Sequence, residues 1–106
     1  MTETKIYVGL NDSVTMTQMF ETEKYISILR NVCLSYHVAF SFSVDHGGYI
    51  HEDGRFTQER TLIVSLIDAE KEIVEEIAKD LCVFFHQESV MVTEEDVRVY
   101  FVRETL

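Results

Sequence analysis

The sequence contains no proline and no tryptophan among its 106 residues, and it has only four glycines. Without proline, no residue forces a helix to end or favours an extended linker. No apolar run approaches the roughly 20 residues that a membrane-spanning helix needs. Residues 1–5 form neither the basic nor the apolar region of a secretory signal. These absences predict a cytoplasmic protein with one domain, residues 1–106, and no membrane partner.

Positively charged residues are also scarce. The chain has nine lysines and arginines and 19 acidic residues, which gives a net charge of −10. Such a field repels phosphate backbones, so nucleic acid is not an expected partner. The acids are spread along the chain, which favours a solubilising role over mimicry of nucleic acid. Cys33 and Cys82, the two cysteines, lie in apolar helical patterns. We expect free thiols in a reducing compartment, with an inter-helix disulfide as the less favoured alternative.

The spacing of apolar residues predicts seven elements in the order β-α-β-β-α-β-β. Helices are expected from Thr22 to Tyr36 and from Asp68 onward, with Thr22 and Asp68 as their N-caps. This order predicts an α+β, ferredoxin-like split β-α-β fold, in which an antiparallel sheet carries two helices on one face and extends into a long β-hairpin arm. The expected strands are 5–9, 38–52, 55–67, 89–92 and 97–102, with a turn at 93–96 between the last two.

The strongest local signal is Asp53-Gly54, a pair typical of a two-residue hairpin turn. The register that such a turn sets would place the apolar residues of one strand opposite the polar residues of the other. A sheet with one buried face does not tolerate this mismatch. One extra residue in the first strand removes the mismatch, and glycine is the residue that bulges favour. The sequence therefore predicts a β-bulge at Gly47-Gly48, which sets Phe42 opposite Val64.

Motifs associated with catalysis are missing. The sequence has no nucleophile elbow, no glycine-rich phosphate loop and no Walker motif, so no catalytic residue and no cofactor is predicted. His46 and His51 flank the expected bulge and are weak candidates for metal ligands. A solvated polar arm is the favoured interpretation of both, because no recognised metal-ligand spacing supports them.

Two regions are candidates for binding. Tyr49, Ile50 and Phe56, near the end of the hairpin arm, form a candidate interface, with simple cross-strand packing as the other interpretation. The polar connection at 10–21 is longer than usual between a strand and a helix, which makes it a candidate functional loop.

Three short segments resemble a family of uncharacterised small bacterial and prophage-encoded domains. They are the opening strand at 5–10, the hairpin segment at 48–54, and Gln87-Glu88-Ser89-Val90 at the entry to a late strand. The resemblance extends over most of the chain. It implies a ferredoxin-like fold and no assigned activity or functional residue. Some relatives in this family look secreted, whereas the lack of a signal peptide here departs from them and points to a cytoplasmic, phage-derived member.

Three hypotheses of function follow. The favoured one is a non-enzymatic binding or regulatory module that self-associates through its sheet or hairpin arm, because catalytic motifs are absent and strand surface is left uncovered. The first alternative is an acidic inhibitor that mimics nucleic acid. The second is a small enzyme or metal-binding protein that uses the 10–21 loop and the hairpin arm. A homo-oligomer is the expected assembly, and another protein is a further candidate partner.

Overall fold

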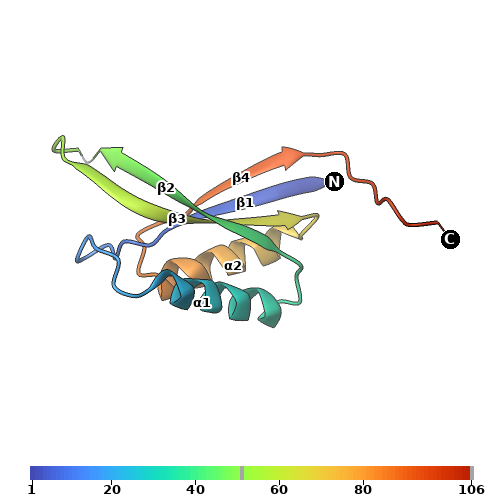
Figure 1. Cartoon of the computed structure of the whole chain (residues 1–106), viewed down its shortest axis with the longest axis horizontal. Coiled ribbons are helices and arrows are strands. Elements are labelled where there is room, and N and C mark those ends of the chain that lie inside the picture. Colours follow the sequence, from blue (N-terminus) through green and yellow to red (C-terminus); the bar gives the residue numbers. More distant parts are fainter. Residues whose placement is uncertain (51, 106) are drawn as a thin grey trace.

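The computed structural model describes residues 1–50 and 52–105, apart from the side chain of Tyr49. The strands form one antiparallel sheet in the order β2-β3-β1-β4, and both helices lie on one face of it (Figure 1). The predicted α+β class is therefore confirmed. In chain order the elements are β1 (Thr2–Gly9), α1 (Thr22–Ser35), β2 (Ser41–Ile50), β3 (Phe56–Ile67), α2 (Lys71–Phe84) and β4 (Met91–Asp96).

The core lies between the helices and the two central strands. Every second residue of a strand points to the same face of the sheet. Ile6 and Val8 of β1 point to the face that the helices cover, so they have no exposed surface. Leu29 of α1 and Ile77 of α2 belong to the same core cluster and are equally buried. Burial of each such aliphatic side chain stabilises the fold by roughly 1.5–3 kcal/mol.

The two cysteines lie on the helices and are free thiols, as predicted. Cys33 is fully buried, and this burial raises the pKa of its thiol to about 11. Cys82 is half-buried, and its Sγ donates a hydrogen bond to the carbonyl oxygen of Gln87 at 2.9 Å. Among the residues that the structure describes, no helix is long and apolar enough to cross a membrane.

The β2–β3 hairpin keeps one register over its whole length. Phe42 lies opposite Val64 as predicted, but the same register continues without interruption through Gly47-Gly48. The predicted β-bulge is therefore wrong. β2 ends at Ile50 and β3 begins at Phe56, so the connection is longer than the predicted two-residue turn, and this greater length supplies the one-residue offset that the bulge would otherwise supply. Gly54 in this loop has a φ of +87°, a conformation that favours glycine.

Both helix starts differ from the prediction. Thr22 is the first residue of α1 and follows the actual N-cap, Glu21. α2 begins later than expected, after Glu70 as its N-cap. Asp68 instead has a φ of +55°, and its N–H donates to the carbonyl oxygen of Thr2 at 2.7 Å, which holds it at the end of the sheet. The predicted N-caps Thr22 and Asp68 are therefore wrong.

The last third of the chain departs most from the prediction. The expected turn at 93–96 lies inside β4, which pairs with β1, and the expected strand at 97–102 is not formed. The seven-element order is therefore wrong. The acidic run that suggested a turn is compatible with an edge strand, because charged side chains there remain in water. Residues 97–105 instead extend away from the body of the molecule (Figure 1).

Candidate functional site

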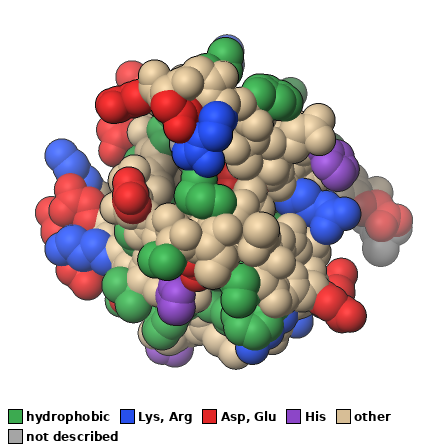
Figure 2. Space-filling view, turned by 90° about the vertical axis from the view of Figure 1, so that its left-hand side faces the viewer, with side chains coloured by type: hydrophobic (Ala, Val, Ile, Leu, Met, Phe, Trp, Pro, Cys, Tyr) green, Lys and Arg blue, Asp and Glu red, His purple; other side chains and the backbone are tan. Residues whose placement is uncertain are grey.

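A polar hollow lies alongside the hairpin arm. Three segments line it: the connection between β1 and α1, residues 55–59 before and within the start of β3, and the connection between α2 and β4. Its volume is about 460 Å³, within the range of roughly 300–1,000 Å³ that is usual for small-molecule sites. A neighbouring hollow of about 380 Å³ shares Asn11 and Glu59 with it. Figure 2 views the molecule from this end, where acidic, basic and apolar side chains lie close together.

Glu59 of β3 lies between the two hollows. The backbone N–H of Asn11 donates to its Oε2 at 3.2 Å, and the side-chain amide of Asn11 donates to the carbonyl oxygen of Gln58 at 3.3 Å. Gly9 makes room for the carboxylate, because a Cβ atom at this position would lie only 2.6 Å from Oε2 of Glu59. Two features therefore position the carboxylate: Gly9 of β1 leaves space for it, and the backbone N–H of Asn11 donates to it.

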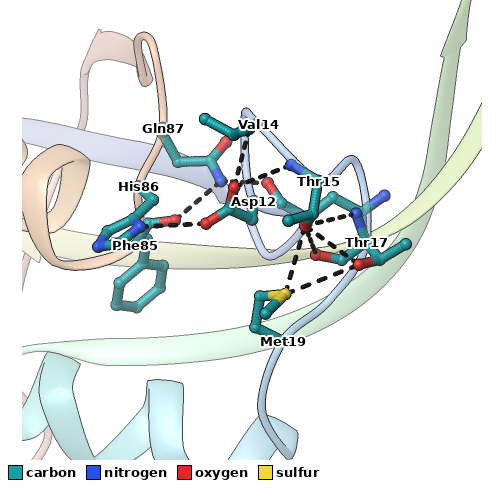
Figure 3. Close-up of polar contacts among 9 residues, drawn as sticks. Asp12, Val14, Thr15, Thr17, Met19, Phe85, His86 and Gln87 are labelled. Carbon is teal, nitrogen blue, oxygen red and sulfur yellow. Dashed lines mark hydrogen bonds and ion pairs between the residues drawn. The ribbon is translucent and has the colours of Figure 1, made fainter.

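Asp12 organises the 10–21 loop (Figure 3). Its Oδ1 accepts the backbone N–H groups of Val14 at 2.8 Å and Thr15 at 3.1 Å, and its Oδ2 lies 3.1 Å from Nδ1 of His86. The two backbone donors, with a smaller contribution from His86, hold the pKa of the Asp12 carboxyl below its ordinary value. Only 12% of the Asp12 side chain is exposed. Asp12 is therefore a charged and nearly buried group that fixes one wall of the hollow.

The end of α2 supplies the opposite wall. His86 has a φ of +53°, and the N–H of Gln87 donates to the carbonyl oxygen of Cys82 at 2.9 Å, the pattern of a Schellman motif. This turn directs Gln87 to the loop, where its Nε2 donates to the carbonyl oxygen of Asn11 at 2.6 Å. In return, the N–H of Ser13 donates to the carbonyl oxygen of His86 at 3.0 Å. The loop and the α2–β4 connection are thus hydrogen-bonded into one unit.

The candidate residues from the sequence lie partly at this site. His46 lines the smaller hollow, whereas His51 lies outside the described residues. Ile50 and Phe56 lie towards the tip of the arm and are 71% and 65% exposed; the side chain of Tyr49 is not described. Within the described part of the chain, no group of three or more His, Cys, Asp or Glu side chains could hold a metal ion.

The 10–21 loop, a candidate functional loop from the sequence, does contribute to the site, but the individual residues that form the site were not predicted. Asn11-Asp12-Ser13 is a cluster of turn-forming residues, and this was the available signal for Asp12. Glu59 carries no such signal, since it is one polar residue among several on the arm. Gln87 was noticed only as part of a resemblance.

This fold and this site define a small α+β protein with a polar, ligand-sized hollow beside a hairpin arm. Among solved structures, the chain is similar to a phage SAM lyase in complex with S-methyl-5′-thioadenosine. The TM-score is 0.71 at 25% identity, and the match covers 90% of this chain and 80% of that one. A phage SAM lyase in the apo state matches with a TM-score of 0.70 at 24% identity, covering 89% and 78% of the two chains. No family model and no curated protein matches the sequence.

These similarities contradict the favoured hypothesis of a non-enzymatic binding module, because the matched structures are those of an enzyme. The hypothesis of an acidic inhibitor and the expectation of no catalytic activity are corrected with it. The prediction was wrong because it was based on local catalytic motifs alone. The residues of the hollow are instead far apart in sequence: 48 positions separate Asn11 from Glu59, and 74 separate Asp12 from His86.

Proposed function

We propose that the chain is a lyase that cleaves S-adenosylmethionine and releases S-methyl-5′-thioadenosine, and that the reaction takes place in the hollows around Asn11 and Glu59. The observation that carries this proposal is the match, over 90% of the chain, to a SAM lyase with that thioadenosine bound. The size of the larger hollow, about 460 Å³, supports a small-molecule substrate.

The proposed reaction breaks the bond between the sulfonium sulfur and Cγ of the aminobutyrate group of the substrate. The electron pair of this bond stays on sulfur, which becomes the neutral thioether of S-methyl-5′-thioadenosine. A lyase adds no water, and an elimination would need a base to take a proton from the substrate. We therefore assign the new bond to Cγ to the substrate's own carboxylate. This closes a five-membered ring, homoserine lactone. The ammonium group remains protonated, so no proton is transferred to or from the protein.

In this reaction the protein binds and orients the substrate. The carboxylate has to approach Cγ from the side opposite the sulfur, and fixing that geometry lowers the barrier. We assign Glu59 to the substrate ammonium group, since its carboxylate has acceptor positions beyond the one that the Asn11 N–H occupies. The larger hollow is lined by three acidic residues, Asp12, Glu59 and Glu88, and by the basic residue Arg55. This excess of negative charge favours a positively charged substrate.

We further infer that the fold is of the ferredoxin-like split β-α-β type. The element order and the strand order β2-β3-β1-β4 support this assignment. Two free thiols, Cys33 and Cys82, support the cytoplasm as the compartment, because free cysteines persist where the environment is reducing. The phage source of the matched lyases supports a phage-derived origin.

The variant Glu59→Gln tests the assignment of the site. The purified chain is incubated with S-adenosylmethionine, and S-methyl-5′-thioadenosine is measured by chromatography with mass detection. We expect kcat/KM to fall by about 10- to 100-fold, the effect of losing one charge-assisted hydrogen bond. The matched control is Glu72→Gln on the exposed first turn of α2, which makes the same change of charge and should retain full activity. Full activity of Glu59→Gln would place the site elsewhere, and an inactive wild-type chain would refute the proposed function itself.

A further inference from the structure

The larger hollow combines one cationic side chain with several acidic ones. Arg55 is the only lysine or arginine among its described lining residues, whereas Asp12, Glu59 and Glu88 supply three carboxylates. Arg55 lies directly before β3, at the end of the connection between the two strands of the hairpin arm. In a hollow with this charge distribution, a negatively charged group of a ligand is attracted to Arg55 and repelled elsewhere.

Arg55, Thr57 and Glu59 form a row along the arm. Alternate residues of a strand point to the same side, which accounts for Thr57 and Glu59, and Arg55 precedes them at the same spacing. All three line the larger hollow. At a rise of about 3.3 Å per residue, the backbone positions of Arg55 and Glu59 lie roughly 13 Å apart. A guanidinium and a carboxylate therefore border one space from its two ends.

Asp53 holds the guanidinium of Arg55 from one side. The Nε atom of Arg55 donates to Oδ2 of Asp53 at 2.7 Å, and the backbone N–H of Arg55 donates to Oδ1 of the same carboxylate at 3.0 Å. The ion pair uses Nε, and a guanidinium carries further N–H donors on its two terminal nitrogens. The Arg55 side chain is 66% exposed, so a ligand can reach these donors. Asp53 thus orients Arg55 without covering it.

Arg60, the next cation along β3, is placed differently. It lies on the other side of the strand from Glu59, lines the smaller hollow and not the larger one, and its Nη1 donates to Oγ1 of Thr22 at 3.4 Å. Arg60 is therefore directed to the start of α1. Of these two arginines, Arg55 is the one that shares a space with the carboxylate of Glu59.

The charged groups of S-adenosylmethionine match this row. Its amino-acid end carries an ammonium group and a carboxylate on the same carbon atom. A site that binds both groups needs an anion and a cation that border one space, which Glu59 and Arg55 supply. With Glu59 assigned to the ammonium group, the carboxylate, the one negatively charged group of this substrate, lies on the side of Arg55.

We propose that Arg55 binds the carboxylate of S-adenosylmethionine and thereby selects substrates that carry this group. The inference rests on the proposed lyase activity and adds to it the residue that orients the nucleophile. In the proposed reaction one carboxylate oxygen forms the bond to Cγ, and the other becomes the carbonyl oxygen of the lactone. The guanidinium donates to the second oxygen, which leaves the first one free to approach Cγ.

Arg55 also rejects a close relative of the substrate. Decarboxylated S-adenosylmethionine keeps the ammonium and sulfonium groups but has no carboxylate to pair with the guanidinium. Its two positive charges would then lie beside the unpaired charge of Arg55, which opposes binding. Removal of Arg55 should therefore have opposite effects on ligands with and without a carboxylate.

Binding of three ligands that the proposed reaction cannot cleave tests this inference. S-adenosylhomocysteine carries the carboxylate and the ammonium group but no sulfonium, decarboxylated S-adenosylmethionine carries no carboxylate, and S-methyl-5′-thioadenosine carries neither group. Dissociation constants are measured by isothermal titration calorimetry. We expect Arg55→Met to bind S-adenosylhomocysteine about 10- to 100-fold more weakly, the effect of losing one charge-assisted hydrogen bond. It should bind the thioadenosine as the wild type does, and the decarboxylated ligand equally well or more tightly.

Two further variants serve as controls. Arg30→Met removes the same charge from an exposed position of α1 outside both hollows, and it should bind all three ligands as the wild type does. Glu59→Gln should weaken the binding of both ligands that carry the ammonium group and leave the thioadenosine unaffected.

Unchanged binding of S-adenosylhomocysteine to Arg55→Met, or an equal loss for all three ligands, would overturn the assigned role of Arg55. A wild-type chain that binds none of the three ligands would instead refute the proposed lyase, whatever the behaviour of the Arg55 variant.

Discussion

At the scale of single residues, Gly9 leaves space in which the charged side chain of Glu59 lies. The carboxylate of Glu59 lies over the bare Cα of Gly9 on the neighbouring strand, and the N–H of Asn11 completes its placement. Nothing in the sequence links these residues, because their proximity depends on the pairing of β1 with β3.

The variant Gly9→Ala should move this carboxylate without unfolding the chain. The new methyl group would lie 2.6 Å from Oε2, but the Glu59 carboxylate is the end of a flexible side chain and can yield. We expect a change of less than about 1 kcal/mol in the free energy of unfolding and a loss of up to about 100-fold in lyase activity, because misplacement by about 1 Å is costly in catalysis. Urea unfolding measures the change in stability, and product formation measures the loss of activity.

A double-mutant cycle supplies the control for this prediction. If Gly9→Ala acts through the carboxylate, it should have little further effect on activity in the Glu59→Gln background. Independent, additive losses in the two variants would show that Gly9 acts by another route.

Asp12 gives a pH-dependent prediction. Its pKa is lowered in the folded chain by the N–H groups of Val14 and Thr15, so its contribution to stability is present above the ordinary pKa of about 4 and is lost as the pH falls through the lowered value. Asp12→Asn should therefore be less stable than the wild type at pH 7. The difference should shrink progressively below about pH 4.

Urea unfolding between pH 7 and pH 3 measures this difference. Asp45→Asn, an exposed change of the same kind on β2, serves as the control and should match the wild type throughout. A stability gap for Asp12→Asn that does not depend on pH would contradict the assigned role of the charge.

At the scale of elements, both helices end in the same way, with a histidine in the left-handed conformation. His37 follows α1 with a φ of +56°, and the next residue, Val38, donates its N–H to the carbonyl oxygen of Cys33. The corresponding residue after α2 is His86, with a φ of +53°. Their role is in the backbone, since each turns the chain out of its helix.

Glycine at position 37 should therefore stabilise the fold, because it adopts this conformation without the steric cost that an L side chain incurs. We expect His37→Gly to raise the free energy of unfolding by roughly 0.5–1 kcal/mol, measured by urea unfolding followed by circular dichroism. The matched control is Leu34→Gly, three residues earlier on an exposed part of α1. The same residue there should lower stability by about 1 kcal/mol, and an equal effect at both positions would contradict this reading of the helix end.

Periodicity predicted β1, both helices and the long hairpin, because each of these elements buries a regular apolar face. It could not predict how the register offset is resolved, since a bulge and a longer loop have the same effect on pairing. It predicted only the beginning of β4, as a strand at 89–92, because exposure of all six residues of β4 removes the alternation that identifies a strand. Periodicity did not indicate the residues of the candidate site. Asp12 contacts His86, and Asn11 contacts Glu59, only when the sheet has formed.

At the scale of the whole molecule, shape and net charge both bear on the proposed activity. The molecule is elongated, 57 Å along its longest axis, with the hairpin arm at one end and the C-terminal tail at the other (Figure 1). The polar hollows lie alongside the arm, and a separate groove lies between β4 and α2. The net charge of −10 favours the approach of a cationic substrate such as S-adenosylmethionine.

The central claim is that this chain cleaves S-adenosylmethionine without adding water. The most direct measurement is to incubate the purified chain with S-adenosylmethionine in ¹⁸O-labelled water and to follow the products by mass spectrometry at early times. We predict equal amounts of S-methyl-5′-thioadenosine and of homoserine lactone that carries no label. No thioadenosine above a protein-free control, or labelled homoserine as the first product, would contradict the account.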